Sequence, residues 1–476
     1  MEGAFHVKGG HFDIAVIGAG SGGLSVAAAA AQFGCKVVLF ERGEMGGDCL
    51  NYGCVPSKAL LAAAKQAHAM RAGAAYGIRP VEPQIDFGAV RAHVQRAIAA
   101  IAPHDSQERF EKLGVTVVRA AAHFLNERTL EAAGERFTAR RMVIATGSSP
   151  ALPPVPGLGG VPYLTNETLF GNDTLPAHLL VLGAGPIGLE MAQAHRRLGS
   201  AVTVIEARLP LGQDDPELSA VVLERLAAEG VDILTGRAAA RVSHDGNGFR
   251  LDFEGGGTLT GSHLLVAAGR RPNVDGLGLE AAGIAFSARG ITVDRGLRTT
   301  NRRVYAVGDV AGGRFTHEAG YQAGIVIRNA LFGLPVKARS SMPHVTYTDP
   351  ELAQAGMTEA EARARHGDRV KLLRWPFSGN DRAQAEGRTD GLVKIVTGPR
   401  GRILGAGIVG PGAGDLIQPW ILALEKGLKI GAMATPVLPY PTRGEAGRRA
   451  AVNYFQEFAS NPLVRGVIRV VSTLRP

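Results

Sequence analysis

Short apolar runs that end in a glycine-rich turn recur along the chain and predict an α/β fold built on parallel strands. The first run, Phe12 to Ile17, leads into Gly18-Ala19-Gly20-Ser21-Gly22-Gly23 and an alanine-rich helix over 24–33. A continuous apolar run bounded by glycines is typical of a strand buried on both faces. A second strand over 36–40 ends at Glu41. In such a βαβ unit the glycines let a pyrophosphate approach the helix N-terminus, and the acid is placed to accept hydrogen bonds from a ribose.

The same pattern occurs a second time further along the chain. A strand over 179–182 leads into Gly183-Ala184-Gly185-Pro186-Ile187-Gly188, a helix to Leu198, and a strand over 201–205 that ends at Glu206. The step from the first glycine to the acid is 23 positions in both units, from 18 to 41 and from 183 to 206. One chain is therefore predicted to hold two dinucleotide-binding units in matching register.

Further elements are predicted between and after these units. They are strands over 141–147, 264–269 and 303–307, helices over 59–69, 101–110 and 319–331, and, after residue 341, strands over 370–375, 393–397 and 403–409 with a helix over 415–426. Residues 1–11 are predicted to be a leader without regular structure, and the proline-rich stretch 150–162 an interdomain connection. The adjacent His104 and Asp105 are interpreted as surface residues, because neighbours on a helix point apart.

Length, composition and charge limit the functional classes. A chain of 476 residues corresponds to about three domains, and 64 glycines suit an α/β enzyme with many tight turns. The formal net charge is +9, but no zinc-finger, basic-zipper or aromatic-basic pattern accompanies it. We interpret the charge as a basic surface that attracts anionic cofactors. No apolar run reaches the roughly 18 residues needed to cross a bilayer, and no export signal is found, which predicts a soluble cytoplasmic protein.

Two of the three cysteines, Cys49 and Cys54, lie five residues apart between a glycine turn and an alanine-rich helix. Five steps along a regular helix rise about 7.5 Å, which exceeds the roughly 7 Å limit on the Cα separation in a disulfide. The first turn must therefore be distorted if the thiols are to bond, and Gly53 allows such a kink. A thiol at a helix start also meets the positive end of the helix macrodipole, which favours the thiolate.

Redox exchange explains this pair better than two alternatives, a structural disulfide and a pair of buried free thiols. Only three cysteines in 476 residues, with no secretory segment, argue against a structural bridge. Buried free thiols would not require the glycines, Pro56 and Lys58 found around them. The third cysteine, Cys35, stands at the entry to a strand and is interpreted as core filling.

The run Gly46 to Lys58, GGDCLNYGCVPSK, resembles the redox-active segment of the FAD-dependent pyridine nucleotide-disulfide oxidoreductases, and the resemblance extends over nearly the whole chain. It implies an α/β protein with two Rossmann-like dinucleotide-binding domains and a C-terminal α+β dimerisation domain. The FAD-binding domain is expected over 12–155 and 278–340, with the NAD(P)-binding domain inserted at 156–277. Residues 341–476 are expected to form the dimerisation domain of a homodimer.

The resemblance also implies an electron path. In the family, NAD(P)H donates hydride to the flavin, which then reduces a cysteine pair that matches Cys49 and Cys54. Cys54 matches the thiol nearest the flavin, which forms the charge-transfer complex, and Cys49 the interchange thiol that meets substrate. Lys58 matches the lysine near the flavin N5, and Glu190 the acid that pairs with it.

Residues that match the cofactor contacts of the family lie in both nucleotide-binding units. They are Gly18, Gly20, Gly23, Glu41, Arg42, Gly47, Asp48, Lys58, Thr146, Gly147, Gly183, Gly185, Gly188, Glu206, Gly269, Gly308 and Asp309. A carboxylate at Glu206 favours a free 2'-hydroxyl and repels a 2'-phosphate, which predicts NADH. Arg208, two residues on, leaves NADPH open. No site for a resident metal is predicted.

Near the C-terminus the chain departs from the disulfide-reducing members of the family. These carry His-Pro followed four residues later by Glu, and the histidine reaches across from the partner subunit as the acid-base group. Here Tyr440 replaces the histidine, and Glu445 is kept. A phenol with a pKa near 10 is a poor proton shuttle at pH 7 compared with an imidazole whose pKa is near 6.5. Reduction of a lipoyl or glutathione disulfide, which requires protonation of a leaving thiolate, is therefore disfavoured.

Mercuric reductases, a branch of this family, resemble the chain better at this position. They too have tyrosine there, and a soft metal ion needs thiolate ligands rather than an acid. They also carry a cysteine pair in the C-terminal tail, whereas residues 455–476 contain no cysteine, so the chain matches neither branch in full. The lead hypothesis is therefore a homodimeric FAD enzyme that moves electrons from NAD(P)H to a thiol-reactive acceptor, in the manner of mercuric reductase.

Two alternatives remain open. One is an enzyme like dihydrolipoamide dehydrogenase that tolerates Tyr440, and the other is a flavoprotein that acts only as a binding or regulatory subunit. The tail over 461–476 intersperses Arg465 and Arg469 among apolar residues. For this tail, packing across the dimer is favoured over contact with a membrane surface.

Overall fold

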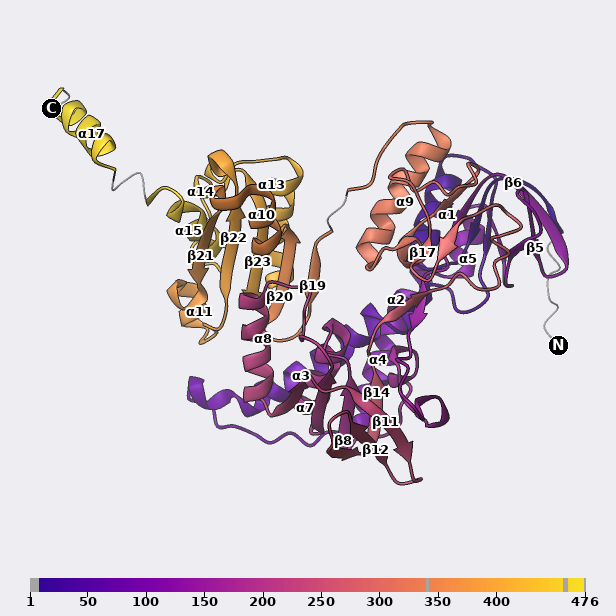
Figure 1. Cartoon of the computed structure of the whole chain (residues 1–476), viewed down its shortest axis with the longest axis horizontal. Coiled ribbons are helices and arrows are strands. Elements are labelled where there is room, and N and C mark those ends of the chain that lie inside the picture. The colour runs from indigo at the N-terminus through magenta and orange to yellow at the C-terminus, as the bar shows by residue number, and fades with distance from the viewer. Residues whose placement is uncertain (1–7, 340–341, 457–460, 475–476) are drawn as a thin grey trace.

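The computed structural model describes residues 8–339, 342–456 and 461–474 as three sheet-based bodies and a C-terminal helix (Figure 1). Most of the predicted leader, residues 1–7, lies outside the described residues, and the first strand already begins at Gly10. None of the helices in these ranges is long and apolar enough to span a membrane.

The first body is a seven-stranded sheet. Its parallel strands, in order across the sheet, are β3 (Val115–Val118), β2 (Val37–Phe40), β1 (Gly10–Ile17), β6 (Glu135–Ile144) and β18 (Val304–Ala306), with β5 (Thr129–Ala132) and β4 (His123–Phe124) added antiparallel beyond β6. Helices α1 (Ser21–Gln32) and α9 (Thr316–Leu331) pack together on one face. Because β18 pairs with β6, two segments of the chain 160 residues apart (304 minus 144) complete one sheet.

Most of the chain between β6 and β18 forms the second body, although Leu277, Leu279, Ile284 and Ile291 pack in the core of the first. Its parallel sheet has the order β10 (Val231–Thr235), β9 (Ala201–Glu206), β8 (His178–Leu182) and β14 (His263–Val266), next to an antiparallel sheet of β11 (Ala239–His244), β12 (Phe249–Phe253) and β13 (Thr258–Gly261). Helices α7 (Pro186–Leu198) and α8 (Pro216–Ala228) belong to this body. Helices α3 (Cys54–Arg71) and α4 (Phe87–Ile101) pack against it, and their apolar side chains share one core with α7. The long helix that begins at Cys54 therefore joins the first body to the second.

The third body is an antiparallel sheet with helices around it. The strand order is β19 (His344–Thr346), β20 (Glu351–Gly356), β23 (Ile403–Gly410), β22 (Leu392–Thr397) and β21 (Lys371–Pro376). The helices are α10 (Glu359–His366), α11 (Asp381–Ala385), α12 (Ala413–Leu416), α13 (Gln418–Glu425), α14 (Gly431–Ala434) and α15 (Glu445–Asn453). The sheet and its helices enclose a core of their own, while Leu352 of β20 and Val409 of β23 also pack into the core of the second body.

Short elements complete the chain. They are α2 (Gly47–Asn51), α5 (Gln107–Lys112), α6 (Asn166–Leu169), α17 (Pro462–Leu474), β7 (Ser148–Pro150), β15 (Arg270–Pro272), β16 (Phe286–Ser287), β17 (Gly290–Ile291), and the 3-10 turns η1 (Gly73–Tyr76), η2 (Ala102–His104), η3 (Leu158–Gly160), η4 (Gly308–Ala311), η5 (Gly367–Arg369), η6 (Phe377–Gly379) and η7 (Pro399–Gly401).

Two predicted helices are wrong in extent. The helix expected over 101–110 is split, because α4 ends at Ile101, Pro103 lies in the turn η2, and Ser106 caps α5 by accepting a hydrogen bond from the Arg109 N–H at 3.2 Å. The helix expected over 415–426 is divided into α12 and α13, and Pro419 occupies the first turn of α13.

A buried ion cluster joins the second body to the third. The ammonium of Lys394, which is 3% exposed on β22, lies 2.8 Å from Asp215, 2.8 Å from Glu217 and 2.9 Å from Glu359. Arg374 adds a second cation, 2.7 Å from Glu217. The hydrogen bond from Arg374, opposed by partial burial and reinforced by Lys394, lowers the pKa of Glu217 to about 2.

Lys394→Met is expected to destabilise the protein by about 3 kcal/mol at pH 7, because it leaves three carboxylates facing one another without their shared cation. The loss should shrink as the pH falls from about 4.5 toward 2. The pKa of Glu217 is lowered from 4.5 to about 2, so its stabilising charge is fully present above pH 4.5 and is lost as the pH falls through 2. Urea unfolding at pH 7 and at about pH 3 measures both effects. Lys426→Met, at an exposed lysine, is the matched control and should change stability by less than about 0.5 kcal/mol.

Candidate active site

The two cysteines of the redox segment lie on different helices. Cys49 is in the short helix α2, and Cys54 is the first residue of α3. The chain turns between them at Gly53, where an added Cβ would lie 3.0 Å from the carbonyl oxygen of Asp48. The side-chain amide of Asn51 closes the preceding turn by donating to the carbonyls of Met45 (3.0 Å) and Gly47 (2.9 Å). The distortion expected from the five-residue spacing is therefore present as a break between two helices.

Both cysteines of the pair are free thiols, and their pKa values are shifted in opposite directions. The Cys49 thiol donates a hydrogen bond to Cys54, and the Thr316 hydroxyl lies 3.5 Å from the Cys54 Sγ. The bond from Cys49, opposed by desolvation but aided by Thr316 and by the charge of Lys58, lowers the pKa of Cys54 to about 6. The same bond, together with burial, raises the pKa of Cys49. At pH 7 the pair is therefore a Cys54 thiolate next to a Cys49 thiol.

One turn further along α3, Lys58 forms an ion pair across the boundary between the first two bodies. Its ammonium lies 2.8 Å from the carboxylate of Glu190, whose side chain is 5% exposed on α7. The backbone N–H of Tyr347 donates to the other oxygen of Glu190 at 2.9 Å. The Lys58 ammonium also lies 4.2 Å from the centre of the Tyr347 ring. Three segments of the chain therefore fix the position of one ammonium beside the thiols.

A second polar network surrounds Asp48, the residue before Cys49. Its carboxylate accepts a hydrogen bond from the Asn166 amide at 2.9 Å and lies 3.3 Å from the Arg270 guanidinium. Arg270 donates to the Ser148 hydroxyl at 2.7 Å, and Ser148 in turn donates to Asp309. Burial raises the pKa of Asp309, although Ser148 and Arg270 oppose this. The network joins two of the predicted cofactor residues, Asp48 and Asp309, through residues that were not predicted.

The two glycine-rich turns have the same local structure. Gly20 and Gly185 are the N-cap residues of α1 and α7, which have no side-chain cap and no acidic residue in the first turn. Glu41 accepts a hydrogen bond from the Ala19 N–H at 2.6 Å, and Glu206 accepts one from the Ala184 N–H at 2.9 Å.

The third glycine of each turn is required by close packing. A Cβ at Gly23 would lie 1.8 Å from the carbonyl oxygen of Gly18, and one at Gly188 would lie 2.0 Å from that of Gly183. By contrast, a Cβ at Gly20 or Gly185 would meet no atom within 4 Å. Open space over an uncapped helix N-terminus fits the pyrophosphate of a dinucleotide in both places.

The remaining predicted cofactor residues line the loops that follow neighbouring strands. The Thr146 hydroxyl donates to the Asn273 carbonyl at 2.8 Å, and the Asn273 N–H donates to the Gly147 carbonyl at 3.0 Å. The Gly308 N–H donates to the Gln322 side chain at 2.7 Å. Three further predicted residues are Arg42, which is exposed after β2, Gly47 (φ +61°), which is the first residue of α2, and Gly269 (φ +144°), which follows β14.

Tyr440 and Glu445 lie in the third body, away from the contacts that join the thiols to Lys58. Tyr440 is 71% exposed, and its hydroxyl donates to the Asp381 carboxylate at 3.1 Å. This bond raises the pKa of Tyr440 above its ordinary value. The Glu445 carboxylate accepts a hydrogen bond from the Thr442 N–H at 3.4 Å. Tyr440 therefore stands at an exposed surface of the dimerisation body as a phenol that holds its proton.

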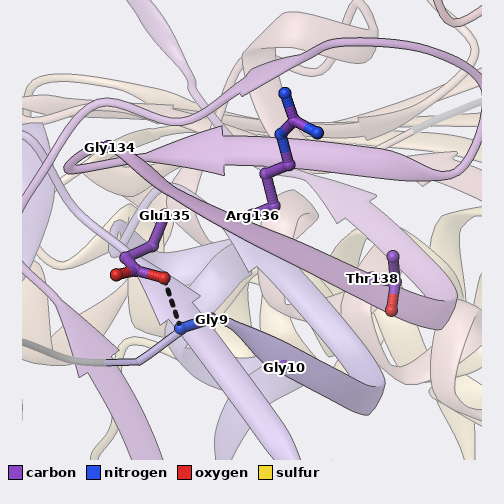
Figure 2. A pocket seen from close by; sticks show the side chains of 6 residues that line it. All are labelled: Gly9, Gly10, Gly134, Glu135, Arg136 and Thr138. Atoms are coloured by element: carbon purple, nitrogen blue, oxygen red, sulfur yellow. Dashed lines mark hydrogen bonds between the residues drawn. The ribbon is translucent and has the colours of Figure 1, made fainter.

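The pocket in Figure 2 is not part of this site. It is lined by Gly9, Gly10, Gly134, Glu135, Arg136 and Thr138, where β1 and β6 begin. The glycine turn that follows Ile17 is at the opposite end of β1. The hydrogen bond drawn there joins the Gly9 N–H to the Glu135 carboxylate at 3.2 Å. Within the described ranges, no group of three or more His, Cys, Asp or Glu side chains is arranged to hold a metal ion.

Five residues of the site were missed by the sequence reasoning as functional candidates: Ser148, Asn166, Arg270, Thr316 and Tyr347. Arg270 and Tyr347 stand in runs that were recognised, GRRPN and HVTYTDPE, but their partners lie more than 100 residues away. No sequence pattern pointed to Thr316, because its contact with Cys54 joins positions 262 residues apart.

Comparison with known proteins agrees with this geometry. Residues 12–325 match the pyridine nucleotide-disulphide oxidoreductase family, and residues 342–451 match the dimerisation domain of that family. Two relatives are 37% identical: a mercuric reductase of Streptomyces lividans, with 94% of this chain and 97% of the relative covered, and a dihydrolipoyl dehydrogenase of Thermus scotoductus, with 92% and 96% covered.

Solved structures give the same result. LpdA from Mycobacterium tuberculosis superposes with a TM-score of 0.86 at 28% identity, covering 93% of this chain and 99% of that one. The HOCl-induced flavoprotein disulfide reductase RclA from Escherichia coli gives a TM-score of 0.83 at 27% identity, covering 92% and 99%. The predicted fold, FAD and a nicotinamide nucleotide as cofactors, and the assignment as an enzyme are thereby confirmed. The chain belongs to the pyridine nucleotide-disulphide oxidoreductase family, as an FAD-dependent oxidoreductase that uses NAD(P)H.

Proposed function

We propose that the protein is a homodimeric enzyme that passes two electrons from NADH through FAD to Cys49 and Cys54, and from these thiols to a soft, thiol-binding metal ion such as Hg(II). The mercuric reductases among its relatives support this acceptor, and the family dimerisation domain over 342–451 supports the dimer. FAD is held by residues of 12–155 and 278–340, NADH by residues of 156–277, and the dimer by 341–476. When bound, FAD supplies a two-electron carrier between the nicotinamide and the thiols.

One observation carries the choice of acceptor: Tyr440, bonded to Asp381, keeps its proton at neutral pH. Reduction of a disulfide substrate releases a thiolate, which needs a proton from a group whose pKa is near 7. A phenol whose pKa lies above 10 is poorly suited to that transfer. A metal ion bound by thiolates needs no such proton, since it takes up electrons only and leaves as the reduced metal. The site therefore suits a metal acceptor better than a disulfide.

The thiol pair is suited to the same task. Cys54 is the thiolate at pH 7, and Cys49, half-buried with a raised pKa, becomes a ligand when a soft cation displaces its proton. Lys58 keeps a positive charge beside the thiolate and stabilises it. Cys49, Thr316 and Lys58 thus stabilise the Cys54 thiolate before an acceptor binds.

Anaerobic stopped-flow assays with NADH test this proposal. Turnover of Hg(II) in excess thiol is expected to exceed turnover of lipoamide by at least about 100-fold, because loss of a general acid slows a reaction by about that factor or more. Tyr440→His should raise lipoamide turnover by about tenfold or more, and Tyr440→Phe should not. Lipoamide turnover by the natural enzyme at rates comparable with Hg(II) would instead support the alternative function, a dihydrolipoamide dehydrogenase like the Thermus relative.

Preference for NADH is assigned to Glu206. Its carboxylate is held by the Ala184 and Arg208 N–H groups at 2.9 and 2.8 Å, at the end of β9 where an adenosine ribose would lie. Glu206→Ala is expected to lower kcat/KM for NADH and raise it for NADPH, so that the ratio shifts by about tenfold, equivalent to about 1.4 kcal/mol. Glu224→Ala, at an exposed acid of α8, is the control. If the ratio of kcat/KM for NADH to that for NADPH is unchanged in Glu206→Ala, Glu206 does not determine the preference for NADH.

A further inference from the structure

The C-terminal helix α17, Pro462–Leu474, has no role in the electron path. Figure 1 shows it standing away from all three sheets, beyond α15 at the end of the third body. None of its residues is buried. Large apolar side chains on this helix are between 49% and 79% exposed: Leu463, Val467, Ile468, Val470, Val471 and Leu474. A folded chain rarely leaves so many large apolar side chains in water without a partner.

Apolar and polar residues of α17 are completely separated around the helix. At 100° per residue, all seven large apolar positions fall within one arc of about 160°. These positions are Leu463, Val464, Val467, Ile468, Val470, Val471 and Leu474. The opposite arc carries Arg465, Arg469, Ser472 and Thr473. The helix is therefore amphipathic along its whole length, with its charges on the face opposite the apolar one.

The two charged side chains of α17, Arg465 and Arg469, are both positive. In the sequence, Arg475 follows them, and the nearest acidic residue is Glu457, five positions before the helix. At 1.5 Å per residue the 13 residues extend about 20 Å, too short to cross a hydrocarbon layer of about 30 Å. These are the features of a helix that lies in the plane of a membrane surface, with long basic side chains reaching toward anionic headgroups.

We propose that α17 binds the surface of an anionic lipid bilayer and so attaches the enzyme reversibly to a membrane. The alternative expected from the sequence, packing of the tail across the dimer, is less consistent with the charge pattern. Packing across the dimer would use the apolar face alone, whereas anionic lipids would also attract each arginine, by about 1 kcal/mol. The proposal is independent of the acceptor of the electrons.

Vesicle flotation of the flavin-loaded, full-length enzyme tests the proposal. Binding is expected to vesicles of 70% phosphatidylcholine and 30% phosphatidylglycerol at 50 mM salt, with at least a tenfold loss at 500 mM salt or with phosphatidylcholine alone. A chain that ends at Asn461 should lose binding and keep its flavin and its NADH oxidation. Val467→Asn on the apolar face should weaken binding about tenfold, and Thr473→Asn on the polar face should not.

Two outcomes would overturn the proposal. In the first, the full-length enzyme stays with the unbound fraction, or the chain that ends at Asn461 floats as well as the full chain does. In the second, light scattering shows that the shortened chain falls from dimer to monomer while neither form binds vesicles. That second result would assign α17 to the subunit interface. Failure of the acceptor assays with normal vesicle binding would affect only the proposed function.

Discussion

Cys54→Ser is expected to abolish NADH-dependent reduction of the acceptor, with a loss on the order of 10³-fold or more. The serine hydroxyl cannot form a disulfide with Cys49 and is not ionised at pH 7, so the thiolate prepared by Cys49, Thr316 and Lys58 is lost. Cys49→Ser should abolish acceptor turnover to the same extent, because both thiols are needed to release two electrons. Turnover alone therefore does not distinguish the two cysteines.

Absorbance of the reduced enzyme distinguishes them. A long-wavelength charge-transfer band is expected in the natural enzyme and in Cys49→Ser, but not in Cys54→Ser. Because the pKa of Cys54 is lowered to about 6, its thiolate is populated above that pH and is lost as the pH falls through it. In Cys49→Ser the hydroxyl can still donate to Cys54, so the midpoint of the band should stay below the ordinary pKa of a thiol. A band that survives in Cys54→Ser would reverse the roles of the two cysteines.

Cys35→Ser is the control for these experiments. Cys35 lies outside the redox segment, is half-buried, and packs beside the core of the first body. Turnover and the charge-transfer band should both be retained, with at most a modest loss of stability. This result would separate the chemistry of the pair from general effects of removing a thiol.

The sequence predicted the parts of this structure that depend on local pattern. Both glycine turns, their strands and helices, and the break between Cys49 and Cys54 follow from spacing and from the steric demands of glycine. The contact between Lys58 and Glu190, expected from the family resemblance, is present at 2.8 Å. What the periodicity misplaced was the helix over 101–110, where Pro103 and the Ser106 cap override the apolar pattern.

Contacts between distant segments are the part that the sequence did not reveal. Thr316 meets Cys54 because the first residues of α9 and α3 lie side by side, and Tyr347 meets Lys58 because the start of the third body lies against α7. Neither contact has a spacing rule that a single sequence displays. The detachment of α17 from the sheets is likewise visible only in three dimensions, although its two faces can be counted along the chain.

The second large effect is expected from Lys58→Met, because Lys58 carries the positive charge next to the Cys54 thiolate and neutralises the buried Glu190. The substitution leaves that carboxylate with only the Tyr347 N–H, so the rate at which NADH bleaches the flavin should fall about 100-fold. The flavin midpoint potential should also fall, by about 30 mV for each tenfold change in the equilibrium. Lys65→Met, at an exposed lysine two turns further along α3, is the matched control. If Lys58→Met keeps both the natural rate and the natural potential, the ion pair only joins the two bodies and has no part in electron transfer.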